Sequence, residues 1–144
     1  MRVVIDTNVT ASRFINAQGA PAEVFGLWQQ QAFELVVSEL ILAEYERVLK
    51  YDRIRVHHRM SDEQIRQVIE DFRELGILVS PTQTLNAIPE DPADNRFLEC
   101  AVKGGAPYIV SGDQHLRALG HYQGIQILSP RAFLILMKEH GDAV

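Results

Sequence analysis

The sequence predicts an α/β fold, a three-layer α/β/α sandwich around a central parallel sheet. Short strand-like runs are apolar on both faces, which is typical of strands that helices cover from both sides. These runs alternate with amphipathic helical segments, and such an alternation implies right-handed crossovers and a doubly wound sheet. The 144 residues, 47% of them hydrophobic, are enough for one domain with a core of its own. We expect this domain to cover residues 1–140, with a short tail at 141–144.

The first 80 residues predict three strands with helices between them. The strands are the apolar runs at residues 2–5, 33–37 and 77–80. The helices are expected over residues 21–31, 38–50 and 61–75. The last of these is the best marked. It opens with a capping box, Ser61-x-x-Gln64, and its apolar residues then recur at helical spacing: Ile65, Val68, Ile69 and Phe72.

The remaining residues continue the alternation. Strands are expected at 107–110 and 125–127, and a helix is expected over 92–103. Asp91 and Pro92 would be the N-cap and the first residue of that helix, which puts Asp94 in its first turn. A short helix should follow Asp113. Ser129 and Pro130 form the same kind of N-cap pair at the start of the last helix.

No segment of the chain looks like a signal for export or membrane insertion. The first apolar run ends at Ile5, which is too short for a signal peptide, and the run Phe133 to Met137 cannot span a bilayer. Cys100 is the single cysteine, so no intrachain disulfide can form, and we expect it to be a core residue. These features predict a cytoplasmic protein that does not enter membranes.

The charge of the chain is unevenly distributed. A net charge of −5 argues mildly against nucleic-acid binding. Residues 47–59, however, carry five cations against Asp52 alone, a local charge of +4: Arg47, Lys50, Arg53, Arg55 and Arg59. This basic segment could contact phosphates of a nucleic acid. It could equally be a solvated helix end and loop.

Two acidic residues follow strands directly. Asp6 comes after the first strand, and Asp113 comes after strand 107–110 through Ser111 and Gly112. Open α/β sheets bind their ligands at the carboxyl ends of the strands. We therefore expect both carboxylates at the edge of the sheet where ligands bind.

Two further acids are expected to point inward from helices. Glu44 borders the apolar face formed by Ile41, Tyr45 and Val48, and Asp94 shares a face with Phe97 and Leu98. Four converging carboxylates would repel one another and raise one another's pKa. Mg²⁺ or Mn²⁺, which prefer oxygen ligands, would remove that cost. The four acids together therefore predict a divalent-metal site.

Each acid also has a simpler structural explanation. Asp6 and Asp113 could be N-caps or turn residues. Glu44 could be a solvated or salt-bridged residue, and Asp94 could interact with the helix dipole, in which case Asp91 could be the ligand instead. Zinc is not expected, because no Cys or His has a suitable spacing. Three histidines are expected to be surface residues and not metal ligands: His57, His58 and His115.

These residues, in this order, resemble the PIN-domain nucleases. The matching segments are Asp6-Thr7-Asn8, Glu44, Asp94-Asn95-Arg96-Phe97-Leu98 and Val110-Ser111-Gly112-Asp113. The match runs from Met1 to about Arg131, and the branch it most resembles contains toxin components of bacterial toxin–antitoxin pairs. Many members carry a further Asp two residues after the fourth acid. This chain has His115 there.

The resemblance implies a Mg²⁺- or Mn²⁺-dependent endoribonuclease that acts on RNA, is blocked by a protein antitoxin and forms a homodimer. Asp6, Asp94 and Asp113 would hold a metal ion, and Glu44 would bind a second ion or a metal-held water. Thr7, Asn8 and Ser111 would support these ligands through hydrogen bonds. One alternative is a catalytically silent RNA- or protein-binding module on the same fold. Another is a nucleotide-binding domain, which would need a glycine-rich phosphate loop where Asp6-Thr7-Asn8 stands.

Overall fold

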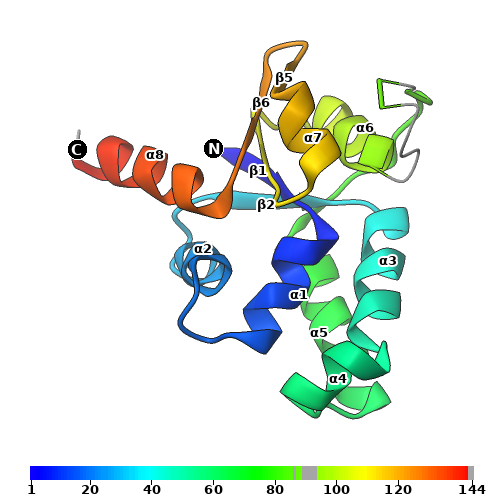
Figure 1. Ribbon diagram of the computed structural model, residues 1–144. Coiled ribbons are helices and arrows are strands. Elements are labelled where there is room, and N and C mark those ends of the chain that lie inside the picture. The colour runs from blue at the N-terminus through cyan, green and yellow to red at the C-terminus, as the bar shows by residue number, and fades with distance from the viewer. Residues whose placement is uncertain (86, 89–93, 143–144) are drawn as a thin grey trace.

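The computed structural model describes all residues except 86, 89–93 and 143–144, and it is built around a six-stranded sheet in the order β3-β2-β1-β4-β6-β5 (Figure 1). The five predicted strands are present as β1 (Arg2–Ile5), β2 (Glu34–Val37), β3 (Ile77–Leu78), β4 (Tyr108–Val110) and β6 (Ile125–Leu128). All neighbouring pairs among them are parallel. The predicted fold class is confirmed.

One strand differs from the prediction. β5 (His121–Tyr122) pairs antiparallel with β6 at the edge of the sheet. The two residues between them, Gln123 and Gly124, both have positive φ, 49° and 83°, as a tight hairpin turn requires. A strand of two residues is too short to show an alternating pattern, so the sequence does not indicate it.

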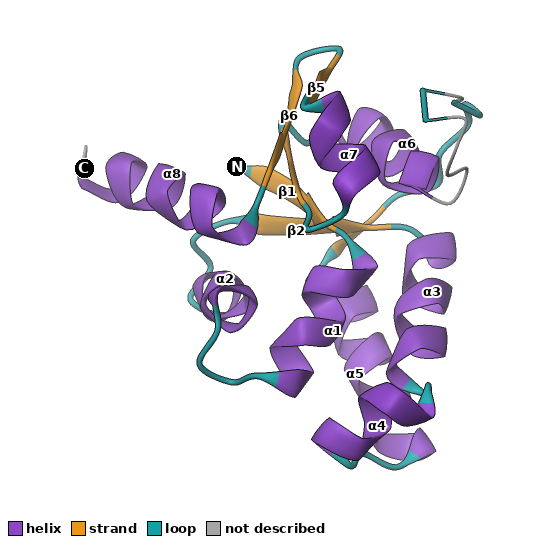
Figure 2. Ribbon diagram, in the orientation of Figure 1, coloured by secondary structure: helices purple, strands orange, loops and turns teal. Residues whose placement is uncertain are grey.

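Helices lie on both faces of the sheet (Figure 2). One face carries α6 (Asn95–Gly104) and α7 (Gln114–Leu119). The other carries α1 (Thr7–Ile15), α3 (Glu39–Leu49) and α5 (Asp62–Leu75), with α4 (Asp52–His58) at the far end of α3 and α5. On the same side, α2 (Ala20–Gln29) packs against α8 (Pro130–Asp142). None of the described helices is long and apolar enough to cross a membrane.

Two of the predicted helix caps are present. Ser61 and Gln64 form both hydrogen bonds of the capping box of α5. The hydroxyl of Ser129 accepts from the N–H of Ala132 at 3.1 Å, where α8 begins. The predicted cap of α6 by Asp91 and Pro92 lies outside the described residues. The α-helix α6 begins at Asn95, and Asp94 directly before it has helical φ and ψ angles of −68° and −24°.

Two helices were not predicted, α1 and α4. α1 has β-branched and polar residues without a clear apolar period, and its start is fixed by Asp6, whose side chain accepts from the N–H of Val9. α4 is seven residues long, lies within the basic segment and ends at Arg59 with a positive φ of 57°. Short charged helices depend on tertiary packing rather than on their own propensity.

The connections reverse direction between β1 and β4. The chain passes from β1 outward to β2 and β3, then returns through α6 to β4 and continues to β6 on the opposite side. Ile5 of β1 is in register with Val110 of β4, and the N–H of Asp6 donates to the carbonyl of Val110 at 3.0 Å. The residues that follow these strands therefore lie next to each other at a topological switch point, where open α/β sheets bind ligands.

Close packing of α6 on the sheet fixes this edge further. A Cβ at Gly104 would lie 2.5 Å from Cγ1 of Val36, so only glycine allows the helix to approach β2 so closely. Cys100 of the same helix is fully buried, as predicted, and burial raises the pKa of its thiol to about 12. Below the sheet, the fully buried Tyr45 of α3 donates its hydroxyl to the carbonyl of Ile5. α6 is thus held against β2, and α3 is anchored at the end of β1.

Candidate functional site

Asp6 lies at the end of β1, with its side chain only 2% exposed. Its Oδ1 accepts from the N–H of Val9 at 2.8 Å, which caps α1, and its Oδ2 accepts from the hydroxyl of Ser111. The same hydroxyl oxygen accepts from the N–H of Asp113 at 2.9 Å. Burial raises the pKa of Asp6 to about 6, although the hydrogen bonds from Ser111 and Val9 oppose the rise. A bound cation would relieve the cost of keeping this carboxylate ionised.

Asp113 and Asp94 form a carboxyl pair beside it. Asp113 caps α7, because its Oδ1 accepts from the N–H groups of His115 and Leu116 at 2.8 and 3.1 Å. Burial acts to raise the pKa of Asp113, but a hydrogen bond with Asp94 and the two backbone N–H groups lower it overall. The Asp94 side chain is buried and that of Asp113 is 22% exposed, so two acidic groups share one contact beside the buried Asp6. A divalent cation bound between the two carboxyl groups would take the place of this hydrogen bond.

Asn95 fixes the backbone directly after Asp94, a role that the sequence pattern does not show. Its side chain is 3% exposed and makes two hydrogen bonds to one residue. Oδ1 accepts from the N–H of Ile88 at 2.9 Å, and Nδ2 donates to the carbonyl of Ile88 at 3.0 Å. The start of α6 is therefore tied to the preceding loop. An Asn directly after an acidic residue at a helix start was the one sequence feature that could have indicated this role.

Glu44 reaches the site from α3. The hydroxyl of Thr7 donates to its Oε2 at 2.8 Å, and Nη2 of Arg47 lies 3.7 Å from its Oε1. The Glu44 side chain is 14% exposed, so the structure excludes a fully solvated residue. Thr7 thus links the helix that Asp6 caps to the helix that carries Glu44.

The four acids line one cavity of about 170 Å³. α1, α3, α6 and α7 surround this edge of the sheet (Figure 1). Thr7 and Asn8, which are predicted to support the ligands, also line the cavity, and the hydroxyl of Ser111 hydrogen-bonds to Asp6. The structure therefore brings together all the acids that the sequence selected, from four separate elements: Asp6, Glu44, Asp94 and Asp113.

The set of donor atoms fits a divalent cation. Asp94, Asp113 and His115 each offer a ligand atom, and these three atoms lie within 4.8 Å of one another. Carboxylate oxygens suit Mg²⁺ and Mn²⁺, and an imidazole nitrogen is a common ligand of transition-metal ions. His115 was expected to be a surface residue rather than a ligand. Its side chain is indeed 44% exposed, yet it belongs to this group, because it follows the cap residue Asp113 by two positions.

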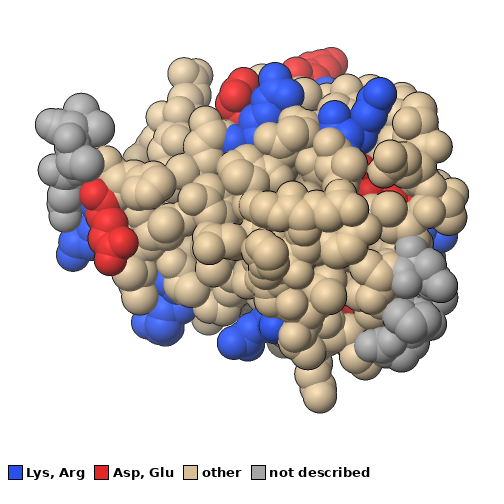
Figure 3. Space-filling model, turned by 90° about the horizontal axis from the view of Figure 1, so that it is seen from above, with Lys and Arg blue, Asp and Glu red and all other residues tan. Residues whose placement is uncertain are grey.

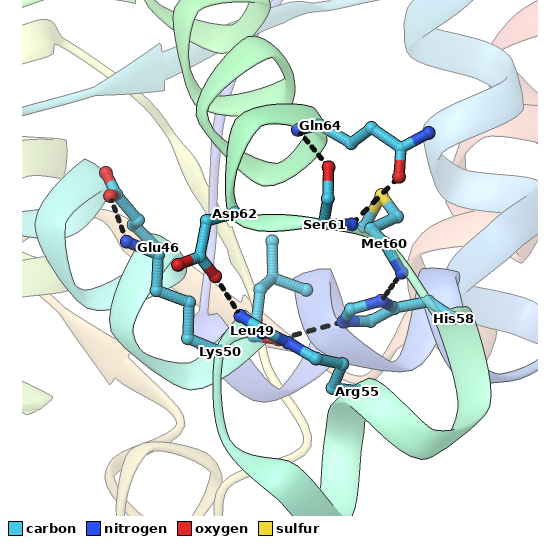
Figure 4. A network of polar contacts seen from close by, with 9 residues as sticks. All are labelled: Glu46, Leu49, Lys50, Arg55, His58, Met60, Ser61, Asp62 and Gln64. Atoms are coloured by element: carbon cyan, nitrogen blue, oxygen red, sulfur yellow. Dashed lines mark hydrogen bonds and ion pairs between the residues drawn. The ribbon is translucent and has the colours of Figure 1, made fainter.

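The basic segment is partly neutralised by nearby acids. Lys50 pairs with Glu46 at 3.0 Å and Arg55 pairs with Asp62 (Figure 4). His58 ties this corner together, because its Nδ1 accepts from the N–H of Met60 and its Nε2 contacts the carbonyl of Leu49.

Arg47 contacts Glu44, which leaves two exposed cations in the segment: Arg53, which lies over the ring of Tyr51 at 5.5 Å, and Arg59. Neither forms an ion pair with another described residue. Figure 3 shows the molecule from above, away from α4, and on this other face Lys and Arg form separate groups. Any contact of this segment with a nucleic acid would therefore rest mainly on Arg53 and Arg59.

Comparison with known proteins places this site in a family. A family model described as PIN domain matches residues 2–115, a stretch that contains all four acids. An uncharacterized protein of Methanocaldococcus jannaschii is 28% identical over 119 residues, which cover 83% of this chain and 75% of that protein. PIN domains are generally nucleases that act on RNA and use divalent metals. The sheet order, the acid-lined cavity at its switch point and the extent of the family match agree, and the chain therefore belongs to the PIN domain family.

Proposed function

We propose that the protein is a metal-dependent endoribonuclease that hydrolyses phosphodiester bonds in RNA. The observation that carries the proposal is the convergence of four acids from four elements in one cavity at the switch point of the sheet. A structural role accounts for each acid singly, since Asp6 and Asp113 are helix caps. It does not account for the contact between the carboxyl groups of Asp94 and Asp113 next to a carboxylate whose pKa is raised by burial.

The residues of the cavity would have different roles in the reaction. The carboxylates of Asp6, Asp94 and Asp113 would hold Mg²⁺ or Mn²⁺, and the hydroxyl of Ser111 keeps Oδ2 of Asp6 in place. When bound, the cation would neutralise phosphate charge and lower the pKa of a water. Thr7 keeps Oε2 of Glu44 in a fixed position, from which the carboxylate would orient the attacking water or hold a second ion.

The test is cleavage of single-stranded RNA in Mg²⁺ or Mn²⁺ by the wild-type chain and by Asp113→Asn. The variant should lose activity by about a hundredfold or more, as expected when a group that acts at the reacting centre is removed. The exposed acid Glu74 offers a matched control, and Glu74→Gln should cleave normally. Circular dichroism should show an unchanged fold for both. Full activity of Asp113→Asn, or activity in excess EDTA, would contradict the proposal.

We further propose that the protein is the cytoplasmic toxin of a toxin–antitoxin pair, blocked by a protein antitoxin and active as a homodimer. The support is the resemblance of its motifs to that branch of the family. Expression in bacteria should slow growth, and co-expression of a small neighbouring gene should restore it. Growth at the normal rate together with sedimentation as a monomer at micromolar concentration would contradict this role.

A further inference from the structure

His115 is partly exposed, yet it lies in contact with the carboxyl pair of Asp94 and Asp113. Its backbone N–H donates to Oδ1 of Asp113 at 2.8 Å, and its ring Nδ1 lies 3.9 Å from the same oxygen. Its ligand atom and those of Asp94 and Asp113 all lie within 4.8 Å of one another. The cap of α7 thus places an imidazole next to two carboxylates, at the open side of the group.

These distances are compatible with a shared ion. Two atoms that each lie about 2.1 Å from one cation are at most about 4.2 Å apart, so the separation of 3.9 Å between His115 and Asp113 already meets this limit. No two of the three ligand atoms are more than 4.8 Å apart, which is about half an ångström beyond the limit. The side chain of His115 is 44% exposed, so a small rotation can bring its ring nitrogen about half an ångström closer without moving the core.

We propose that His115 is a direct nitrogen ligand of the cation held by Asp94 and Asp113, and that it makes the site prefer first-row transition-metal ions over Mg²⁺. This proposal rests on the proposed function only in assuming that the cation occupies this site. Mg²⁺ favours oxygen ligands and gives up its waters reluctantly, whereas imidazole binds transition-metal ions well and more strongly along the series from Mn²⁺ to Co²⁺. The expected order of affinity is Co²⁺, then Mn²⁺, then Mg²⁺.

The first experiment is electron paramagnetic resonance of MnCl₂ bound to the wild-type protein, with pulsed detection of coupling to ¹⁴N. A nitrogen coupling is expected, and it should disappear in His115→Ala and in His115→Asp. It should persist in the control His121→Ala, which removes another exposed histidine from the same chain. Absence of nitrogen coupling in the wild type, or its persistence in His115→Ala, would overturn the proposal without any appeal to activity.

The second experiment is calorimetric titration of the same proteins with MnCl₂, CoCl₂ and MgCl₂. His115→Ala should weaken Mn²⁺ and Co²⁺ binding by at least about tenfold, the loss caused even by removing residues that merely support a ligand. Mg²⁺ binding should change little. If His115 only pairs with Asp113, all three affinities will stay as in the wild type, and the proposal fails.

The two proposals can fail separately. RNA cleavage in Mg²⁺ without nitrogen coupling to bound Mn²⁺ would overturn the role of His115 and leave the nuclease function standing. Nitrogen coupling in a protein that cleaves no RNA would establish the ligand and contradict the nuclease function.

Discussion

Replacement of Asp6 by Asn should make the metal-free protein more resistant to unfolding at neutral and alkaline pH than the wild type. The Asp6 carboxylate is 2% exposed, and burial raises its pKa from 3.8 to about 6. Asn has nearly the same shape. Its Oδ1 can accept from the N–H of Val9, and its amide can donate to the hydroxyl oxygen of Ser111. The variant keeps these contacts and loses the buried charge.

The sign follows from the raised pKa. A group whose pKa is higher in the folded state contributes stability below its unfolded pKa, and this contribution is lost as the pH rises through the folded value. For a rise from 3.8 to about 6, at about 1.4 kcal/mol per pKa unit, the total is about 3 kcal/mol. Between pH 4.5 and pH 8, about 2 kcal/mol of it should be lost by the wild type and not by Asp6→Asn.

Urea unfolding in EDTA at the two pH values measures this difference, with fluorescence of Trp28 as the probe, because its ring packs against Phe25 and Phe72. Comparing the change with pH in each protein cancels any cost of the substitution that does not depend on pH. Glu74→Gln removes an exposed acid and should follow the wild type. Parallel curves for the wild type and Asp6→Asn would refute the reasoning.

Three further outcomes are expected. Mn²⁺ should raise the melting temperature more at pH 7.5 than at pH 5, because the cation binds the folded state and finds its ligands ionised at the higher pH; equal shifts would contradict a shared acidic site. Arg53→Glu combined with Arg59→Glu should weaken RNA binding and flatten its salt dependence, while the rate at saturating RNA falls less than in Asp113→Asn; unchanged affinity and slope would mean that RNA binds elsewhere. Gly104→Ala should cost about 1–3 kcal/mol in urea unfolding, since its Cβ would overlap Val36. Gly26→Ala, with no atom within 4 Å of the added Cβ, should instead stabilise α2 by about 0.5–1 kcal/mol, and equal effects of the two alanines would contradict the packing explanation.

The chain itself specifies its strands and most of its helices. β1, β2, β4 and β6 are continuous apolar runs, because a strand buried on both faces has no polar side to alternate. The capping residues Ser61 and Ser129 act on neighbours three positions away, so their effect is visible in the sequence. The juxtaposition of Asp6 and Asp113 could also be anticipated, since carboxyl ends of parallel strands meet at one edge.

Contacts between residues that are distant in the sequence could be seen only in the tertiary structure. The sequence could not indicate that Asp94 and Asp113 hydrogen-bond to each other, nor that Asn95 clamps Ile88 beside them. It showed a run of cations in the basic segment, but not that Asp62, on another helix, pairs with one of them. Pairings of this kind depend on how helices pack, and no periodicity in the chain encodes them.

The sequence by itself therefore determined the sheet, the order of the four acids and the edge at which they meet, because these follow from local hydrophobic patterns and from strand direction. Only the tertiary structure decided the contact within the carboxyl pair, the place of His115 beside it and the helices α1 and α4. The physical reason is distance. Burial, hydrogen bonding and ion pairing act over a few ångströms between residues as far apart in the chain as Asp6 and Ser111.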